Sequence, residues 1–169
     1  MQTRLFEPLA MEVSFGWPGL QGAEQPWGHW LVGGVLTPHA PDGAYHLPDL
    51  IHPAGDVNAA LDDYIRFVQL HLRGLQERES FLSPATFRKL HQPVGSYALG
   101  WFIVDAEGAA VSQHLGNAGT FFAVVALAPQ ADLGVIVFTN AGHPQAQRAV
   151  EQMGTDILRI WGRVAQDDR

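Results

Sequence analysis

The 169-residue sequence contains no cysteine and a single lysine, Lys89. Without cysteine the chain has no disulfide, no thiolate nucleophile and no sulfur ligand for zinc. Its 10 basic residues are outnumbered by 17 acidic ones, so the formal net charge is −7. A protein that follows a nucleic-acid backbone needs a large basic face. We therefore expect no nucleic-acid partner.

Long hydrophobic runs are also missing. The most apolar stretch, residues 121–128, has the length of a strand and is too short to cross a membrane. The first residues do not resemble a signal peptide, because no apolar segment of the required length follows Arg4. We expect a soluble chain without a membrane span, and its compartment stays unknown.

The first third of the chain differs in pattern from the residues that follow. Residues 1–56 are rich in glycine, proline and tryptophan and show no period, which disfavours long helices. Over residues 57–73 apolar side chains recur every three or four positions and predict a helix. Asp56 or Asn58 would cap this helix and Gly74 would end it.

A second, shorter helix is expected from the cap and first-turn pair Ser83-Pro84 to Leu90. Four apolar runs separated by turn residues then predict an antiparallel meander over residues 97–104, 110–115, 120–128 and 133–139. The last two runs are apolar at nearly every position, which is typical of strands covered on both faces.

A final helix over residues 145–161 has an apolar stripe that would cover one face of this sheet, and the sequence shows no obvious cover for the other. The fold class is therefore α+β, with a Gly/Pro-rich N-terminal region, an antiparallel meander and a packed C-terminal helix. We assign residues 1–96 to the loop-rich and helical part of one domain. Residues 97–169 form its antiparallel strands and C-terminal helix.

Six segments stand out together: LFEPLAM at 5–11, HPAGDVNAALDDYIRFVQLHLRG at 52–74, LSPATFRKLHQP at 82–93, YALGWFI at 97–103, HLGNAGTF at 114–121 and APQADLGVIVFTN at 128–140. In order and spacing they resemble the C-terminal portion of the serine β-lactamase-like hydrolases, the family of class C β-lactamases, penicillin-binding proteins and carboxylesterases. The resemblance implies a partial β-lactamase/transpeptidase-like fold, an antiparallel sheet with helices on both faces.

The resemblance also implies a catalytic apparatus of three motifs that works through an acyl-enzyme: S-x-x-K, Y-x-N, and K-T-G or H-x-G. Only the third has a counterpart here, at His114 to Gly116. None of the five serines is followed by lysine at the third position, and none of the three tyrosines by asparagine at the second. In the family both motifs precede the first of the six segments, so we expect them upstream of residue 1. Alone, the chain would be inactive.

By the same resemblance, His114 would hydrogen-bond the substrate or tune a neighbouring base. Gly116 would let a substrate backbone approach the strand, and the backbone N–H of Asn117 would be one oxyanion donor. On spacing alone, His-x-Gly is simply the end of a strand before a turn. Trp27 and His29 lie in a tryptophan-rich loop that would be either a pocket wall for an acyl group or only a packed loop.

The eight histidines show no metal-binding spacing, so we predict neither a metal nor a cofactor. The parent protein would act on a small-molecule ester, amide or β-lactam, and a histidine in the third motif favours an esterase or peptidase. The alternative is a non-catalytic binding module of the same fold. Such a module would self-associate or pair with a missing N-terminal half through an exposed apolar face and an unpaired sheet edge.

Overall fold

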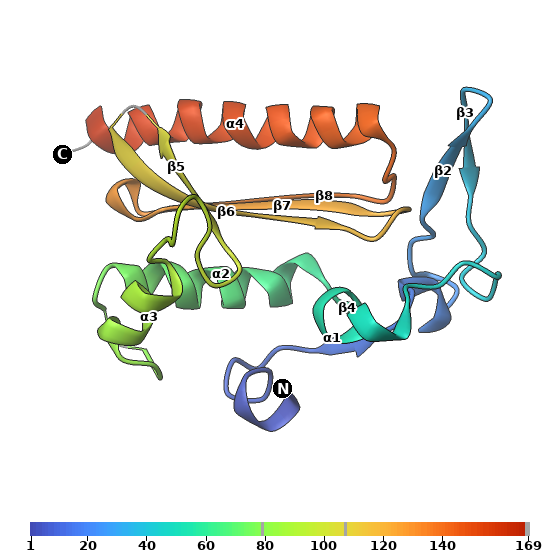
Figure 1. Cartoon of the computed structure of the whole chain (residues 1–169), viewed down its shortest axis with the longest axis horizontal. Helices are drawn as coiled ribbons and strands as arrows, with labels where there is room; N and C mark the ends of the chain where they lie inside the picture. The colour runs from blue at the N-terminus through green and yellow to red at the C-terminus, as the bar shows by residue number, and fades with distance from the viewer. Residues whose placement is uncertain (79, 107, 168–169) are drawn as a thin grey trace. The chain divides into compact units, whose positions relative to one another are not determined.

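The computed structural model describes residues 1–78, 80–106 and 108–167 (Figure 1). The residues that lie close to one another in space divide the chain into two compact units. Unit 1 comprises residues 1–66, 116–123 and 138–150, and unit 2 comprises residues 67–115, 124–137 and those from 151 onward. The sequence-based division of the domain at residue 97 stays a prediction.

Most of a four-stranded sheet lies in unit 2, with its strands in the order β5-β6-β7-β8, as the meander predicted. The strands are β5 (Phe102–Ala106), β6 (Ala109–Asn117), β7 (Phe122–Ala128) and β8 (Leu133–Thr139). β7 is buried at six of its seven positions. Residues 97–101, predicted as the start of the first strand, form a turn instead, in which Gly100 has a φ of +93°.

Two helices, α2 (Leu61–Leu75) and α4 (Pro144–Asp167), begin in unit 1 and continue into unit 2. Within unit 2, their parts from Phe67 and from Glu151 onward cover opposite faces of this sheet (Figure 1). A Cβ added to Gly134 of β8 would lie 2.8 Å from Val68 of α2. One added to Gly154 of α4 would lie 3.4 Å from Val124 of β7. The second cover, which was not evident from the sequence, is therefore α2.

The C-terminal helix is longer than predicted, and its apolar stripe is only partly used. Val150 and Gly154 are buried, but the side chains of Met153, Ile160 and Trp161 are more than half exposed. These three residues belong to the stripe that we expected to lie on the sheet. Periodicity locates an apolar face, but it does not show how much of that face finds a partner.

The start of the helix expected from residue 57 was wrong. Residues Val57–Ala59 form strand β4, which pairs antiparallel with β1 (Val13–Phe15). Asn58 accordingly does not cap α2. Its Nδ2 donates to the Gly16 carbonyl at 2.6 Å, and its Oδ1 accepts from the Ser14 hydroxyl. Pairing with a distant segment outweighed the local helical pattern.

Gly74 was also predicted wrongly, because it lies inside α2 and does not end it. It is buried against helix α3 (Pro84–Leu90), and a Cβ at this position would lie 2.2 Å from the Phe87 ring. α3 begins as predicted, since the Ser83 Oγ accepts from the Thr86 backbone N–H at 3.2 Å. The glycine therefore permits two helices to pack closely.

Unit 1 contains most of the proline-rich segment. In residues 1–56, all of which the structure describes, the longest helix is the four-residue α1 (His52–Gly55), as expected from the prolines. The other elements there are the strand β1, the hairpin β2 (His29–Val32) with β3 (Val35–Pro38), and the 3₁₀ turns η1 (Gln2–Arg4), η2 (Pro18–Leu20) and η3 (Asp49–Ile51). Gly33 and Gly34 both have positive φ, which the two-residue hairpin turn requires.

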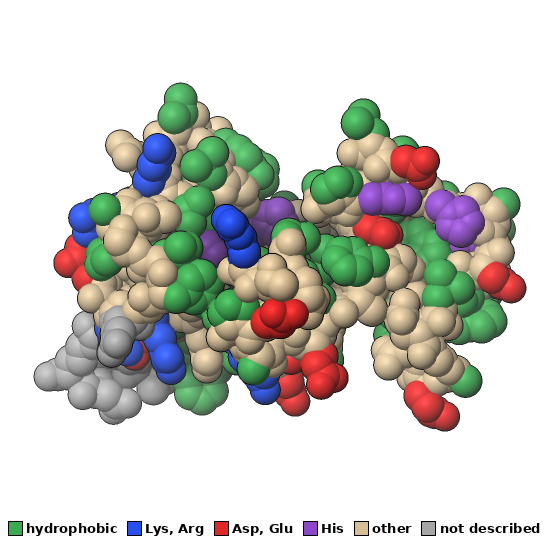
Figure 2. All heavy atoms as spheres, turned by 90° about the horizontal axis from the view of Figure 1, so that it is seen from below, with side chains coloured by type: hydrophobic (Ala, Val, Ile, Leu, Met, Phe, Trp, Pro, Cys, Tyr) green, Lys and Arg blue, Asp and Glu red, His purple; other side chains and the backbone are tan. Residues whose placement is uncertain are grey.

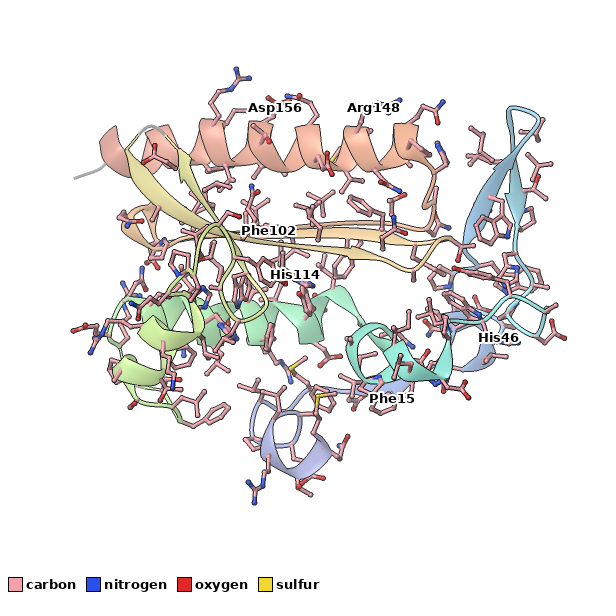
Figure 3. All side chains as sticks on the ribbon, in the orientation of Figure 1. Phe15, His46, Phe102, His114, Arg148 and Asp156 are labelled. Atoms are coloured by element: carbon pink, nitrogen blue, oxygen red, sulfur yellow. The ribbon has the colours of Figure 1, made fainter. Side chains whose placement is uncertain are left out.

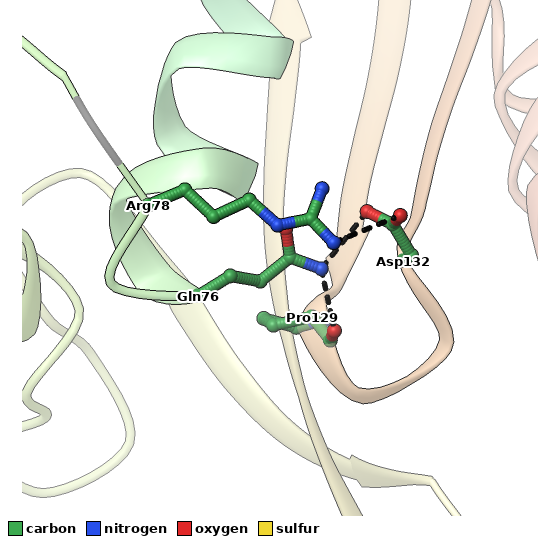
Figure 4. Close-up of polar contacts among 4 residues, drawn as sticks. All are labelled: Gln76, Arg78, Pro129 and Asp132. Carbon is green, nitrogen blue, oxygen red and sulfur yellow. Dashed lines mark hydrogen bonds and ion pairs between the residues drawn. The ribbon is translucent and has the colours of Figure 1, made fainter.

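The turn between β7 and β8 contains η4 (Pro129–Ala131) and is held by polar groups that follow α2 (Figure 4). The Gln76 Nε2 donates to the Pro129 carbonyl and to the Asp132 Oδ1, each at 2.9 Å. An Arg78 Nη2 donates to the other oxygen of the same carboxylate at 3.3 Å. Asp132 has a φ of +53°, so these hydrogen bonds stabilise a left-handed backbone conformation that residues other than glycine rarely adopt.

Gly74→Ala is expected to destabilise the protein. Alanine favours a helix by about 1 kcal/mol, but forcing a methyl group into a packed contact costs typically about 1–3 kcal/mol or more. A Cβ on the Gly74 backbone would lie only 2.2 Å from the Phe87 ring, so the cost of this overlap should exceed the gain in helix propensity. Urea denaturation should therefore show a lower midpoint. The control is Gly22→Ala, where nothing lies within 4 Å of the new methyl group. An unchanged midpoint for Gly74→Ala would contradict the close packing.

Candidate functional site

The three residues of the His-x-Gly motif region lie on one strand, β6, and the structure places them beyond its pairing with β5. β5 begins at Phe102, which is opposite Gln113. From His114 to Asn117, β6 therefore continues past the start of β5. A strand that outruns its neighbour leaves backbone groups on that side for another extended chain, such as a substrate.

His114 is half-buried on the α2 side of the sheet (Figure 3). Its Nδ1 lies 2.9 Å from the Gly100 carbonyl oxygen. Because a carbonyl only accepts hydrogen bonds, Nδ1 carries the hydrogen in this contact. In the neutral ring the other nitrogen, Nε2, then has a free lone pair and acts as an acceptor or base. One backbone contact thus fixes the chemical character of the motif histidine.

Gly116 is not required by the fold. Its φ is outside the positive range, and a Cβ there would meet only the Ala123 Cβ at 3.7 Å, an ordinary van der Waals distance. Gly28 differs, since a Cβ there would lie 2.3 Å from the Thr120 hydroxyl oxygen. No contact among the described residues requires glycine at position 116, which leaves room for a requirement from a bound molecule.

Asn117 is exposed, and its side chain shapes the turn after β6. The Oδ1 accepts from the Gly119 backbone N–H at 2.7 Å, the local bond that asparagine commonly makes in turns. Gly119 has a φ of +80°, and the Ala118 N–H donates to the Phe121 carbonyl to close the turn. The expected use of the Asn117 backbone N–H as an oxyanion donor stays a prediction.

Trp27 and His29 belong to unit 1 and are brought together by Asn140. The His29 Nδ1 donates to the Asn140 carbonyl, and the Asn140 Nδ2 donates to the Trp27 carbonyl, each at 3.0 Å. The Trp27 side chain is 44 % exposed. Asn140 holds the tryptophan-rich loop, a partnership across more than a hundred residues that no local pattern signals.

Behind this loop, unit 1 packs a cluster of aromatic rings. Trp17 stacks on Tyr45 and Phe121, with ring centroids 5.7 and 6.0 Å apart, and Trp30 meets Tyr45 edge-on at 4.9 Å. The Tyr45 hydroxyl donates to the Ala118 carbonyl at 3.3 Å. A shallow hollow lies beside the cluster, lined by Trp17, Gly19, Pro26, Trp27, Gly28, His39, Pro41 and Phe121.

Sequence reasoning missed a buried hydrogen-bonded chain of three side chains in unit 2. The His71 Nδ1 lies 2.9 Å from the His91 Nε2, and the His91 Nδ1 lies 2.9 Å from the Ser112 Oγ. All three residues are at most 7 % exposed. One signal was present: His71 lies on the apolar face of its predicted helix, three residues after Val68. Their meeting depends on tertiary packing.

Burial keeps both histidines of this chain neutral. It lowers the pKa of His71 to about 3, with a smaller contribution from the repulsion of a charged His91, and it lowers the pKa of His91 to about 4. Aromatic rings complete the surroundings: His71 packs against Phe67 and Phe87, and Trp101 packs against both histidines. At neutral pH a single hydrogen is shared between the facing nitrogens of the two rings.

Metal, membrane and nucleic-acid binding each require particular features of the described residues. In the part of the chain that the structure describes, no three histidine or carboxylate side chains are placed to hold a metal ion. No helix among the described residues is both long and apolar enough to cross a membrane. On the face shown in Figure 2, the lysine and arginine side chains lie apart and form no continuous patch.

The sequence model of the β-lactamase family matches residues 1–156. The chain belongs to the β-lactamase family. No protein with a curated description matches it significantly. The family membership confirms what the six ordered segments predicted. The assignment of His114 to Gly116 as the third motif of the family stays a prediction.

Two solved structures of the β-lactamase/transpeptidase fold are similar to this β-lactamase-family chain. One is an octameric penicillin-binding protein homologue from Pyrococcus abyssi, with a TM-score of 0.69 and 20% identity, covering 92% of this chain and 36% of that one. The other is a class C β-lactamase from Rhodobacter sphaeroides, with a TM-score of 0.66 and 18% identity, covering 93% of this chain and 53% of that one. The chain thus spans about half or less of each, and the likeness confirms the predicted fold.

The two buried histidines should make this β-lactamase-family protein sensitive to acid. Since their folded pKa values of about 3 and 4 lie below the ordinary value of 6.5, the unfolded chain binds protons more readily below pH 6.5. The free energy of unfolding should therefore fall as the pH is lowered from 6.5 toward 4, by up to about 1.4 kcal/mol per pH unit for each histidine.

Urea denaturation at pH 7, 6, 5 and 4.5 measures this dependence. His71→Phe keeps a ring in the aromatic site and removes one titrating group, so its stability should be lower at pH 7 but less dependent on pH. The control is His46→Gln, which alters an exposed histidine of unit 1. Equal pH slopes for the wild type and His71→Phe would show that the buried pair does not cause the acid sensitivity.

Proposed function

We propose that this chain provides one wall of a serine hydrolase site of the esterase or peptidase type, which acts on a small ester, amide or β-lactam through an acyl-enzyme. The observation that carries the proposal is the arrangement on β6. A histidine with a fixed proton and a glycine that the fold does not need lie two residues apart where the strand has passed β5.

Acyl transfer by serine needs a nucleophile, a base and hydrogen-bond donors for the developing oxyanion. The serine oxygen attacks the carbonyl carbon while the base takes its proton, and the base passes that proton to the leaving alcohol or amine. Water then attacks the acyl-enzyme, which releases the carboxylic acid and regenerates the serine hydroxyl. In this scheme the lone pair on the His114 Nε2 accepts a hydrogen bond from the substrate or the catalytic base. Gly116 lets the acyl group lie against β6, and the Asn117 N–H donates to the oxyanion.

The nucleophile in this proposal comes from outside the 169 residues. Ser112 is hydrogen-bonded to a histidine in the way a catalytic serine often is, but it is only 6 % exposed and faces the buried pair. No substrate carbonyl reaches it there. An S-x-x-K serine on another segment is the natural source, because that motif is what the family uses.

Trp27 carries a separate proposal, which rests on the contacts of unit 1 alone. Its side chain is partly exposed at the edge of the shallow aromatic hollow in unit 1, and His29 holds the loop through Asn140. Such a surface suits the apolar part of an acyl group. In this view Trp27 contacts substrate, and His29 keeps the loop in place.

The alternative function is a non-catalytic, self-associating module of the same fold. The apolar side chains of Met153, Ile160 and Trp161, which are exposed on α4, favour it. β8 is also the outer strand of the sheet as described. The Pyrococcus abyssi homologue is octameric. Sedimentation velocity decides this point, because a clean monomer at all concentrations would count against the alternative.

The enzymatic proposal is tested by making the chain alone and together with the polypeptide encoded immediately upstream. Assays with a p-nitrophenyl ester and a chromogenic cephalosporin should show no turnover for the chain alone and turnover for the pair. In the active pair, His114→Gln should lower kcat/KM by about 100-fold, the scale of a lost acid–base partner. Gly116→Ala should also lower it while leaving the urea midpoint unchanged.

The matched glycine control is Gly22→Ala, which is remote from β6 in sequence and has open space around it. Turnover by the chain alone that is lost on changing one of its five serines would overturn the proposal. So would an active pair in which His114→Gln has no effect.

A further inference from the structure

The buried chain of His71, His91 and Ser112 lies next to the motif histidine, although the proposed reaction gives it no role. Two sets of contacts lead from His91 toward His114, one through the strand that carries it and one through the turn that fixes its proton. All the residues concerned belong to unit 2.

The first set of contacts runs along β6. Ser112 and His114 are two residues apart on the strand, so their side chains point to the same face. The Ser112 Oγ is hydrogen-bonded to the His91 Nδ1 at 2.9 Å. His91 follows directly after α3, whose packing against α2 at Gly74 leaves no space for a Cβ. Through Ser112, two residues before His114, β6 is thereby held to the end of the closely packed helix α3.

The second set of contacts runs through the turn at residues 98–101. The Trp101 ring packs on His91 with centroids 4.7 Å apart, and the Trp101 carbonyl accepts from the Ala98 N–H at 2.7 Å. Within the same turn the Leu99 N–H donates to the carbonyl of Leu90 at 3.2 Å, and Leu90 directly precedes His91. This turn presents the Gly100 carbonyl that accepts from the His114 Nδ1.

We propose that His91 is a positioning residue that keeps the hydrogen of the His114 ring on Nδ1, by fixing both the strand that carries His114 and the turn that accepts its hydrogen bond. Its importance for catalysis rests on the proposed function. The effect on the protonation of the ring does not, because it follows from contacts within this chain alone.

A buried histidine suits this task because it has two hydrogen-bonding edges and a flat face. Its Nδ1 edge serves Ser112, its Nε2 edge serves His71, and its face packs on Trp101. No apolar residue of similar size offers both edges. A phenylalanine keeps the packing on Trp101 and loses both hydrogen bonds, while Ser112→Ala removes only the bond to the strand.

The protonation of the His114 ring is measured by long-range ¹⁵N–¹H NMR of the isolated chain near pH 7.5, which distinguishes a nitrogen that carries hydrogen from one that does not. In the wild type we expect the Nδ1–H form of His114. In Ser112→Ala and in His91→Phe the ratio of the Nδ1–H to the Nε2–H form should fall by about twofold or more, since the anchored contact loosens. Ser96→Ala, at an exposed serine in the same unit, is the matched control.

The proposal is overturned if the wild-type ring carries its hydrogen on Nε2, or if a folded Ser112→Ala protein has an unchanged ratio. Should His91→Phe not fold, Ser112→Ala and the wild type still decide. A changed ratio in both variants, combined with failure of the upstream polypeptide to produce turnover, would retain the positioning role and remove the proposed function. The two can therefore fail separately.

Discussion

The structure of unit 2 depends on the burial of β7 on both of its faces. An apolar strand at the centre of a sheet must be covered above and below, and here α2 and α4 provide the two covers. This constraint determines where glycine is tolerated and where it is needed. Gly134 of β8 leaves space for the Val68 side chain of α2, and Gly154 of α4 lies against the Val124 side chain of β7, so each helix contacts the sheet through a valine that faces a glycine.

The same burial explains why His71, His91 and Ser112 are hydrogen-bonded to one another in series. A polar group removed from water without a partner costs about 1–3 kcal/mol, and three such groups would consume much of the stability of a domain. Pairing edge to edge avoids that cost as long as the rings are neutral. The depressed pKa values are the electrostatic consequence of the arrangement, and they restrict its full stability to neutral and alkaline pH.

Much of the fold was readable in the sequence because its signals are local. The cap at Ser83, the turns between the strands and the prolines before residue 57 act over a few residues, and the structure follows them. The failures involve distant partners. Residues 57–59 pair with β1, and Gly74 is required by close packing against Phe87. Residues 97–101 form a turn in which the Leu99 N–H donates to the Leu90 carbonyl. No periodic pattern encodes which remote segment a residue will meet.

The candidate site shows the same contrast between local signals and distant partners. The sequence predicted a strand over residues 110–115, and β6 runs on to Asn117. The state of the His114 ring was not predictable, because it depends on a carbonyl fourteen residues away. Conversely, the structure explains Gly74 completely and Gly116 not at all. At Gly116 the φ is ordinary and a Cβ would meet the Ala123 Cβ at only an ordinary van der Waals distance of 3.7 Å, so no described contact there requires glycine. Gly116 follows a histidine with a fixed proton, and this juxtaposition is the basis for proposing that a substrate approaches the strand there.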